Sequence, residues 1–284
     1  MVGDITLNLQ DLALVLRSSW GGRVLSLTWR GQPILSPMQG AEGVFDGRNW
    51  PKGGAYPLFP FHNRIPLGRF SYRGRDVRLP VHPQEPNAVH GHAHQQPWHV
   101  VDASDAAAEL AYEDAGDGAW PWAFTASQRF QLRPNGLELL LSIRNQADEP
   151  MPAGLGWHPF FAKALRISSD AGREWAMGAD FLPSGVWHPA GAEGAGTRYL
   201  SDWSRVDLAL SSGLRVTMRA SGLPHLVIHD PERAYSCVEP VNHLANSINL
   251  YPHRAADNLA DLAPGGLLQA RISLVFRSLQ APPQ

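Results

Sequence analysis

The sequence has little that would cross-link, anchor or strongly charge a folded chain. Cys237 is the only cysteine, which excludes an intramolecular disulfide and any CxxC zinc or redox site. The balance of 24 lysines and arginines against 26 aspartates and glutamates gives a net charge of −2, which argues against a nucleic-acid partner. No apolar run approaches the ~20 residues of a membrane helix. Residues 1–11 hold no apolar signal-peptide segment, so we expect a cytoplasmic protein.

Several motifs of enzyme chemistry are also missing. The G-x-S-x-G of nucleophile-elbow hydrolases does not occur. Neither G-x-G-x-x-G nor G-x-x-x-x-G-K-[ST] occurs, so the glycines for dinucleotide or P-loop binding are missing. An enzyme built from this chain would therefore act through side chains alone, or through a metal held by histidine and carboxylate.

The composition predicts a folded chain with many turns. Hydrophobic residues make up 44% and charged residues 18%, which excludes a disordered chain. The 27 glycines and 24 prolines exceed the usual share and indicate frequent turns. The 284 residues would suit one large domain or two small ones. Because we find no linker and no internal repeat, we expect one domain over residues 1–284.

The dominant hydrophobic period is two, which predicts half-buried strands. The clearest alternating segments are Ile5–Leu9, Leu25–Trp29, Phe70–Tyr72, Val77–Leu79, Leu137–Ile143, Val206–Leu210, Leu214–Met218, His225–His229 and Leu267–Phe276. Asn135-Gly136 and Ser212-Gly213 separate such segments and indicate hairpins. Residues 185–196 are rich in glycine and are expected to form a loop. With few helical turns expected, the pattern predicts an all-β fold, either a large antiparallel β-sandwich or a distorted barrel.

Three ionisable residues lie in segments too apolar for a solvated surface. Arg64 lies within such a run, and Glu239 ends a strand-like run before a proline. Each needs a partner if it is buried, so each is either a member of an internal ion pair or a residue of a functional site. His158 follows glycines, precedes a proline and is flanked by aromatic residues, so it is either a core histidine or a proton-transfer group. Cys237 would face the same side as Glu239 on a strand, and we interpret it as a small buried hydrophobe.

His90, His92 and His94 alternate along the chain. On a strand they would project from one face, which is the geometry of a metal site in a cupin-like barrel. Such a site would normally add a glutamate shortly afterwards, but Gln95, Gln96, Pro97 and Trp98 follow instead. We therefore expect no metal, and we interpret His92 and His94 as loop histidines on a polar rim.

Four segments, taken together and in order, resemble the aldose 1-epimerase (galactose mutarotase) family. They read PLFPFHNRIPLGRFSYRG, AVHGHAHQQPW, GLGWHPFF and CVEPVNHLANSIN. The resemblance covers about residues 20–277. It implies an isomerase that interconverts the α and β anomers of a free aldose. It also implies a galactose mutarotase-like supersandwich whose open face holds a monosaccharide, with no cofactor and no metal.

The resemblance also assigns roles to individual residues. It implies that Glu239 is the catalytic base and His158 the catalytic acid. Arg64 and His90 would bind the sugar. The family also places an aspartate on the sugar hydroxyls, and the nearest match here is Asp202.

Other functions remain open from the sequence. A hexose-phosphate epimerase of the same family would need additional cations near the site, and the candidates are Lys52, Arg48 and Arg69 beside Arg64. A non-catalytic carbohydrate-binding protein would not need the acid–base pair. A glycoside hydrolase would need two carboxylates at the cleavage point. The sequence determines neither the identity of the sugar nor the oligomeric state.

Overall fold

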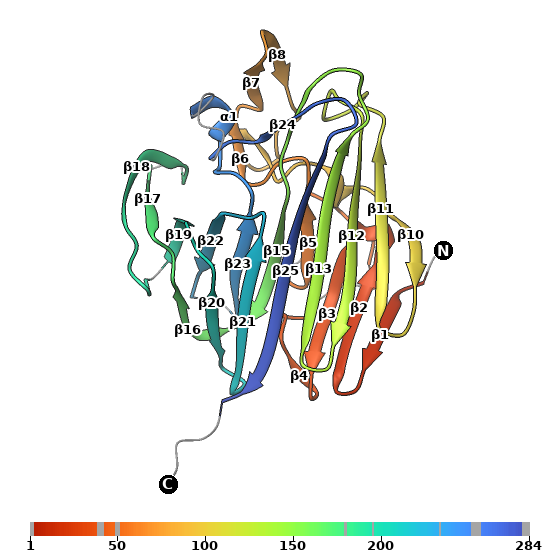
Figure 1. Cartoon of the computed structure of the whole chain (residues 1–284), viewed down its shortest axis with the longest axis vertical. Coiled ribbons are helices and arrows are strands. Elements are labelled where there is room, and N and C mark those ends of the chain that lie inside the picture. The colour runs from red at the N-terminus through yellow and green to blue at the C-terminus, as the bar shows by residue number, and fades with distance from the viewer. Residues whose placement is uncertain are drawn as a thin grey trace.

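Two large antiparallel sheets dominate the chain, as the period-two pattern predicts (Figure 1). The computed structural model describes residues 3–38, 43–48, 52–178, 181–194, 196–232, 234–250 and 257–279. Every strand pair within the described ranges is antiparallel, apart from an isolated parallel bridge between Phe59 and Gly91. The fold class expected from the sequence is thus confirmed.

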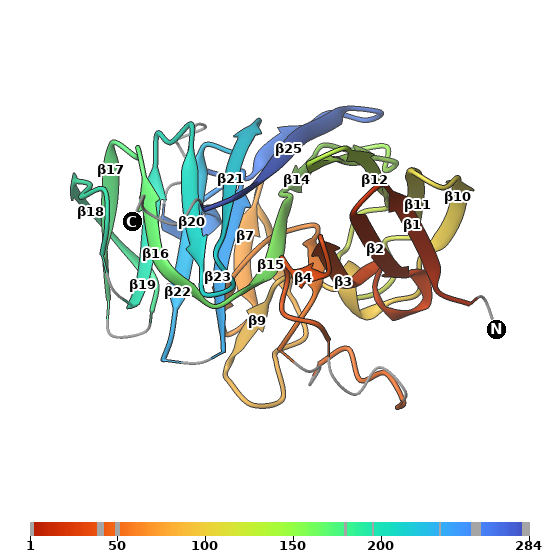
Figure 2. The ribbon, with the colours of Figure 1, turned by 90° about the horizontal axis from the view of Figure 1, so that it is seen from below.

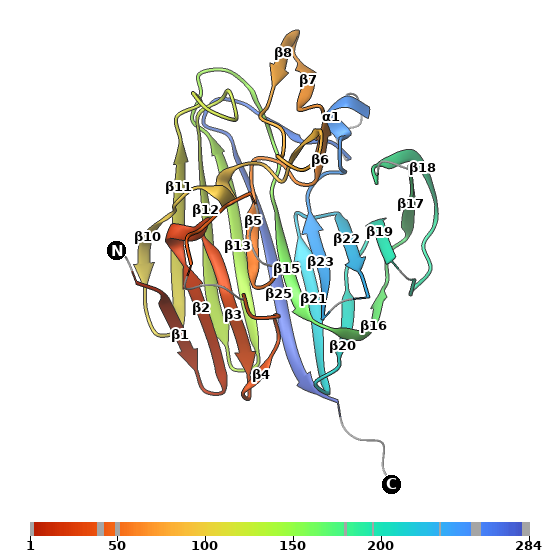
Figure 3. The ribbon, with the colours of Figure 1, turned by 180° about the vertical axis from the view of Figure 1, so that it is seen from behind.

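The larger sheet has 11 strands. Its order is β1 (Ile5–Leu9), β2 (Leu12–Arg17), β3 (Arg23–Trp29), β5 (Ala55–Leu58), β15 (Gly156–Ala162), β23 (Tyr235–Val241), β22 (His225–Asp230), β19 (Gly196–Ser201), β17 (Arg173–Met177) and β18 (Pro183–Pro189), with β4 (Gln32–Pro33) paired to β3. Figure 3 shows this sheet in front.

The smaller sheet has eight strands and covers one face of the larger one (Figure 2). Its order is β10 (His99–Ala103), β11 (Ala107–Asp114), β12 (Phe124–Arg133), β13 (Gly136–Asn145), β25 (Leu267–Ser278), β21 (Leu214–Ser221), β20 (Val206–Leu210) and β16 (Ala164–Ser169). The predicted turn at Asn135-Gly136 joins β12 to β13, where Arg133 pairs with Gly136.

Short elements lie around the sheets. Three two-stranded ladders join β6 (Arg64–Pro66) to β9 (Asn87–Val89), β7 (Arg69–Tyr72) to β8 (Arg75–Arg78), and β14 (Met151–Ala153) to β24 (Ala260–Leu262). The helical turns among the described residues are η1 (Ser18–Trp20), η2 (Ala93–Gln95) and α1 (Ser247–Leu250). None of these described helices is long and apolar enough to cross a membrane.

Alternation along the central strands divides the core into two clusters. On β23, Val238 belongs to the large cluster between the sheets, together with Leu139 and Ile272 of the smaller sheet. Its neighbour Cys237 belongs to a second cluster on the outer face of the larger sheet. Successive side chains of a strand point to opposite faces, so both clusters draw on the same strands. β23 is consequently buried along its whole length.

One sequence expectation about local structure is wrong, and the strand-face alternative for the three histidines does not occur. Residues 185–189, expected to be loop, belong to β18, which pairs with β17 in a hairpin. His90, His92 and His94 do not share a strand face, because β9 ends at Val89 and the chain then turns. His90 and Gly91 both have positive φ, of 61° and 66°, which an extended strand does not contain.

The turn at Gly91 is closely packed, and this yields a stability prediction. A Cβ at Gly91 would lie 2.0 Å from the carbonyl oxygen of Phe59, whereas a Cβ at Gly74 would meet nothing within 4 Å. Both glycines have positive φ, so alanine costs about 1 kcal/mol of conformational strain at either position. We expect Gly74→Ala to lower the free energy of unfolding by about that amount, and Gly91→Ala by about 3 kcal/mol or more.

Urea unfolding of the two variants measures this difference, and Gly74→Ala serves as the matched control for backbone strain. Equal midpoints for the two variants would show that the Phe59–Gly91 contact does not restrict the turn.

Candidate active site

A cleft of about 330 Å³ is lined by four of the five residues selected from the sequence: Arg64, His90, His158 and Glu239. They come from β6, from the turn after β9, from β15 and from β23, and lie far apart in the sequence. Other polar lining residues are Lys52, Asn63, Thr197, Tyr199 and His229, while Phe181 and Val227 add apolar surface. The cleft thus opens on the outer face of the larger sheet, opposite the smaller sheet.

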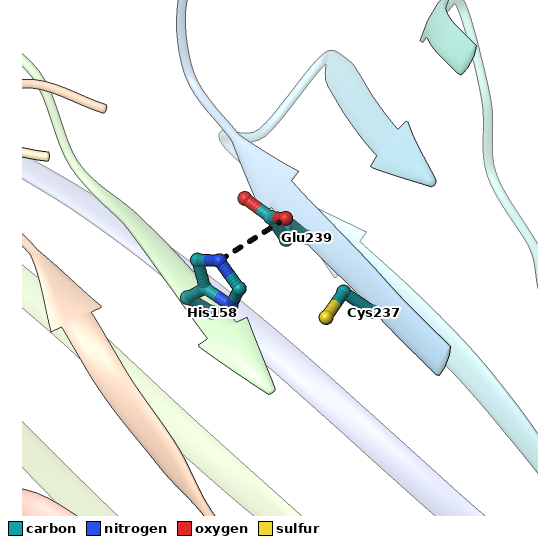
Figure 4. A group of neighbouring side chains, drawn as sticks. All are labelled: His158, Cys237 and Glu239. Atoms are coloured by element: carbon teal, nitrogen blue, oxygen red, sulfur yellow. Dashed lines mark ion pairs between the residues drawn. The ribbon is translucent and has the colours of Figure 1, made fainter. Parts of the chain in front are cut away.

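His158 and Glu239 are cross-strand neighbours. Gly156 pairs with Val241 and Phe160 pairs with Cys237, so this antiparallel register places His158 directly opposite Glu239. The Nε2 atom of His158 lies 3.3 Å from Oε1 of Glu239 (Figure 4). The two residues are only 8% and 4% exposed, which makes this a buried acid–base pair at the edge of the cleft.

Aromatic stacking fixes the imidazole of His158. Tyr56, its partner on β5, stacks at 4.6 Å with an interplanar angle of 24°. Phe160 stacks at 4.7 Å with an angle of 21°. Since the ring cannot turn without breaking both contacts, its nitrogens keep their direction toward Glu239 and the cleft.

Burial shifts the pKa values of this pair in opposite directions. Desolvation raises the pKa of Glu239 to about 8, against weaker effects of Arg64 and Lys52. Desolvation also lowers the pKa of His158 well below its usual value, and the charge of Lys52 acts in the same direction. At neutral pH the free pair therefore holds one proton, on Glu239, and is uncharged. For Glu239 to act as a base and His158 as an acid, this proton must therefore first pass from Glu239 to His158.

The pair also has unused hydrogen-bonding capacity. Among the described residues, neither Oε2 of Glu239 nor Nδ1 of His158 has a hydrogen-bond partner. A buried polar atom without a partner costs about 1–3 kcal/mol. A polar ligand in the cleft could recover that free energy, so both atoms favour binding of a molecule rich in hydroxyls.

His90 presents a donor to the same cleft. Its Nδ1 accepts a hydrogen bond of 3.1 Å from the backbone N–H of Asn63, so the ring proton resides on Nε2. Desolvation by burial lowers the pKa of His90 well below its usual value, which keeps the ring neutral. The ring lies edge-on to that of His158 at 5.2 Å. His90 can therefore donate one hydrogen bond and carries no charge.

Arg64 is held at the cleft by a carboxylate. Its Nη2 donates a 3.1 Å hydrogen bond to Oε1 of Glu85, and the two side chains are partly exposed. Its backbone N–H donates to the side-chain oxygen of Asn63, whose amide nitrogen donates to the hydroxyl of Tyr199. This chain of contacts orients Arg64 at the cleft. Arg64 is thus a member of an ion pair and also lines the cleft, and its sugar-binding role stays a prediction.

Asp202, the fifth selected residue, does not line the cleft. It follows β19 in a turn, and its side chain is more than half exposed. Its Oδ1 accepts a 2.9 Å hydrogen bond from Nη2 of Arg173. That ion pair satisfies the carboxylate, and the structure does not bring Asp202 together with the other four residues.

His92 and His94 are buried away from the expected polar rim. His92 contacts Asp114 through its Nε2 atom and borders a separate cavity of about 100 Å³. His94 packs against Tyr56 at 4.9 Å. The three alternating histidines therefore do not surround one point, and in this arrangement they cannot bind one metal ion together.

Sequence reasoning missed the wall formed by β19 and β22. Thr197 and His229 are directly paired across these strands, and the threonine hydroxyl lies 2.8 Å from Nδ1 of His229. The strand over His225–His229 was recognisable, and its alternation assigns Val227 and His229 to one face. Only the strand order reveals that this face adjoins Glu239, because Val227 pairs with Glu239.

One group of side chains in the described part of the chain has the spacing of a metal-ligand set. Ligand atoms of His158, Cys237 and Glu239 all lie within 4.8 Å of one another (Figure 4). Cys237 and Glu239 are two residues apart on β23 and therefore lie on the same face of the strand, as expected from the sequence. Any ion bound there would use both members of the acid–base pair.

Comparison with known proteins agrees with this picture. Residues 4–187 match the family model described as aldose 1-epimerase. The matched range includes Arg64, His90 and His158 but ends before Glu239. An uncharacterized protein of Escherichia coli K12, YphB, is 31% identical over 167 residues, which are 57% of this chain and 54% of that protein. The chain thus matches about half the length of this curated relative.

Two solved structures illustrate the fold. A galactose mutarotase-like protein from Clostridium acetobutylicum has a TM-score of 0.85 at 21% identity, over 96% of this chain and 94% of its own. The galactose 1-epimerase from Lactobacillus acidophilus has a TM-score of 0.76 at 14% identity, over 98% and 95%. At this level of identity the likeness establishes the galactose mutarotase-like fold.

The pKa of Glu239 can be measured directly. With carbon-13 in the glutamate side-chain carboxyls, we expect one resonance to titrate near pH 8 and to vanish in Glu239→Gln. Solvated glutamates titrate near pH 4.3, so the shifted signal stands apart. A midpoint below pH 5 for the Glu239 signal would show that water reaches the carboxyl in solution.

Proposed function

Because the chain belongs to the aldose 1-epimerase family, we propose that it interconverts the α and β anomers of a free aldose. The observation that carries the proposal is the buried, cross-strand pair of His158 and Glu239 at the edge of a cleft. A volume of about 330 Å³ is at the small end of ligand pockets and suits a monosaccharide. The activity in the name of the Lactobacillus relative is consistent with this proposal.

Ring opening requires one proton to leave the C1 hydroxyl and one to reach the ring oxygen. The proton on Glu239 first passes to His158 across their 3.3 Å contact, which gives a carboxylate and an imidazolium. Glu239 then takes the proton of the C1 hydroxyl while His158 gives its proton to the ring oxygen, and the bond between C1 and the ring oxygen breaks. The open aldehyde leaves Glu239 protonated and His158 neutral, as they began.

Closure on the other face completes the exchange. Rotation about the C1–C2 bond turns the opposite face of the aldehyde to the C5 hydroxyl. The same two groups then move their protons in reverse, so the enzyme returns to its starting state. Protein and sugar neither gain nor lose atoms or electrons in the cycle, and the described side chains suffice for it.

The remaining lining residues would hold the sugar while C1 moves. His90 supplies an N–H donor and Arg64 supplies a guanidinium, and both suit sugar hydroxyls. The Thr197–His229 pair adds hydroxyl and imidazole groups on the opposite wall. We assign no substrate contact to Asp202, since Arg173 occupies its carboxylate.

A phosphorylated aldose is a second candidate substrate, favoured by Lys52. This lysine lines the cleft together with Arg64, and a phosphate would attract both cations. Arg48 borders the separate cavity and Arg69 is exposed on β7, so these two do not add to the cleft. Polarimetry with matched free and phosphorylated aldoses distinguishes the two substrate classes.

The hydrolase alternative lacks its second carboxylate. Glu239 is the only aspartate or glutamate among the described residues lining the cleft. Glycoside hydrolysis uses two such groups flanking the scissile bond. A binding protein without turnover remains the main rival, and the acid–base variants test it.

Loss of either member of the pair should slow anomer exchange while leaving the fold intact. Glu239→Gln keeps the shape of the side chain but cannot carry the proton, and His158→Asn removes the imidazole. General acid–base groups contribute about 10²–10⁴-fold each, so each variant should lose about two decades of rate or more. Polarimetry at saturating aldose measures this, after subtraction of the uncatalysed exchange.

Arg64→Ala and His90→Ala should behave differently, because they remove holding groups rather than the proton path. We expect these variants to raise KM as well as lower kcat. If Glu239→Gln exchanged anomers at close to the wild-type rate with sugar binding retained, the protein would be a binding module.

The pH dependence of kcat/KM should report the shifted pKa values of the free pair. The proposed cycle needs one shared proton. Activity should therefore fall above about pH 8 as Glu239 loses it, and should persist below pH 6.5 until His158 gains a second one. A profile that declines on the acid side with a midpoint at or above 6.5 would contradict the uncharged resting pair.

A further inference from the structure

We propose that His158, Cys237 and Glu239 form a binding site for a thiophilic divalent cation such as Zn²⁺, and that its occupation switches off anomer exchange. The binding step stands on the geometry alone, whereas the inhibition rests on the proposed function of the pair. The site would be inhibitory, so it differs from a catalytic metal centre.

The backbone arrangement brings the three side chains into one space. Cys237 and Glu239 are two residues apart on β23 and therefore point to the same face, and His158 lies opposite Glu239 on β15. Their ligand atoms lie within 4.8 Å of one another (Figure 4). Tetrahedral zinc places such atoms about 3.3–3.6 Å apart, so shifts of about 1 Å close the group around an ion.

The donor set has the chemistry that zinc prefers. Thiolate, imidazole and carboxylate are its three common protein ligands, and three protein ligands leave one position for water from the cleft. Oε2 of Glu239 and Nδ1 of His158, both nine-tenths or more buried, have no hydrogen-bond partner among the described residues. Both residues therefore have polar capacity that no described residue uses.

Occupation and catalysis exclude each other. An ion bound by His158 and Glu239 prevents both from exchanging protons with a sugar. The Cys237 thiol, which burial keeps protonated, loses its proton to solvent when sulfur binds the ion, and Glu239 does the same if it is protonated. Access runs through the cleft, because Cys237 itself is 1% exposed while the other two ligands line the opening.

A single cysteine makes the binding test unambiguous. Thiolate bound to Cd²⁺ gives an ultraviolet charge-transfer band, and Cys237 is the only thiol in the chain. We expect Cd²⁺ to produce the band in the wild type and in the control His188→Gln, an exposed histidine on β18. The band should be absent in Cys237→Ser. It should weaken in His158→Asn and Glu239→Gln, since a lone thiol binds less tightly.

Inhibition is measured on the same proteins. Zn²⁺ should slow anomer exchange by the wild type and by His188→Gln, and Cys237→Ser and Cys237→Ala should need about tenfold more Zn²⁺ or higher. The cysteine variants keep the acid–base pair, so they should remain active without metal. Equal inhibition of wild type and cysteine variants, or a Cd²⁺ band unaffected by His158→Asn and Glu239→Gln, would overturn the proposal.

The two proposals can fail separately. If the wild type exchanges no anomers, the Cd²⁺ band still decides whether the site exists. If the wild type is active and gives no band, the metal site is refuted and the proposed function is untouched.

Discussion

The register between β15 and β23 is the constraint on which the rest of the site depends. It places His158 opposite Glu239 and, through the same alternation, aligns Cys237 with Phe160. A slip of one residue would turn His158 toward the cluster between the sheets and replace it with Trp157 or Pro159. Packing on both faces of β15 and β23 makes such a slip costly, so the sandwich as a whole maintains the 3.3 Å contact.

Burial determines how this contact behaves. Both partners would be charged if they were solvated as a close pair, and the low-polarity surroundings favour the arrangement in which neither is. Stacking by Tyr56 and Phe160 supplies those surroundings and also fixes the ring. The same two side chains thus fix the orientation of His158 and contribute to its burial.

The sequence allowed most of the sheet structure to be predicted, because alternation and turn residues act locally. Asn135-Gly136, for example, needs no information about the rest of the chain to indicate its hairpin. The strand order, in contrast, depends on pairings such as β5 with β15 and β15 with β23, which period-two patterns do not encode. The convergence of Arg64, His90, His158 and Glu239 was therefore accessible only through the resemblance.

The errors have physical causes of the same kind. His92 and His94 were placed on an exposed rim because their burial depends on distant partners, Asp114 and Tyr56, which the local sequence does not show. Asp202 was selected from a short motif, although its partner Arg173 lies on a neighbouring strand. The protonation of Glu239 could not be deduced, since desolvation is a property of the folded surroundings. Thr197 and His229 were missed because their relevance comes from strand neighbours.

The two faces of the larger sheet have different tasks: one packs the core between the sheets, and the other lines the cleft. Along β22, Leu226 and Ile228 belong to the cluster between the sheets, while Val227 and His229 line the cleft. Substitutions of the core residues alter the stability of the fold, and substitutions of the cleft residues alter which ligand binds. Such a strand can acquire a new ligand preference by replacing every other residue, with the architecture left in place. The sheet is in this sense a scaffold whose core-facing and cleft-facing residues can evolve independently of each other.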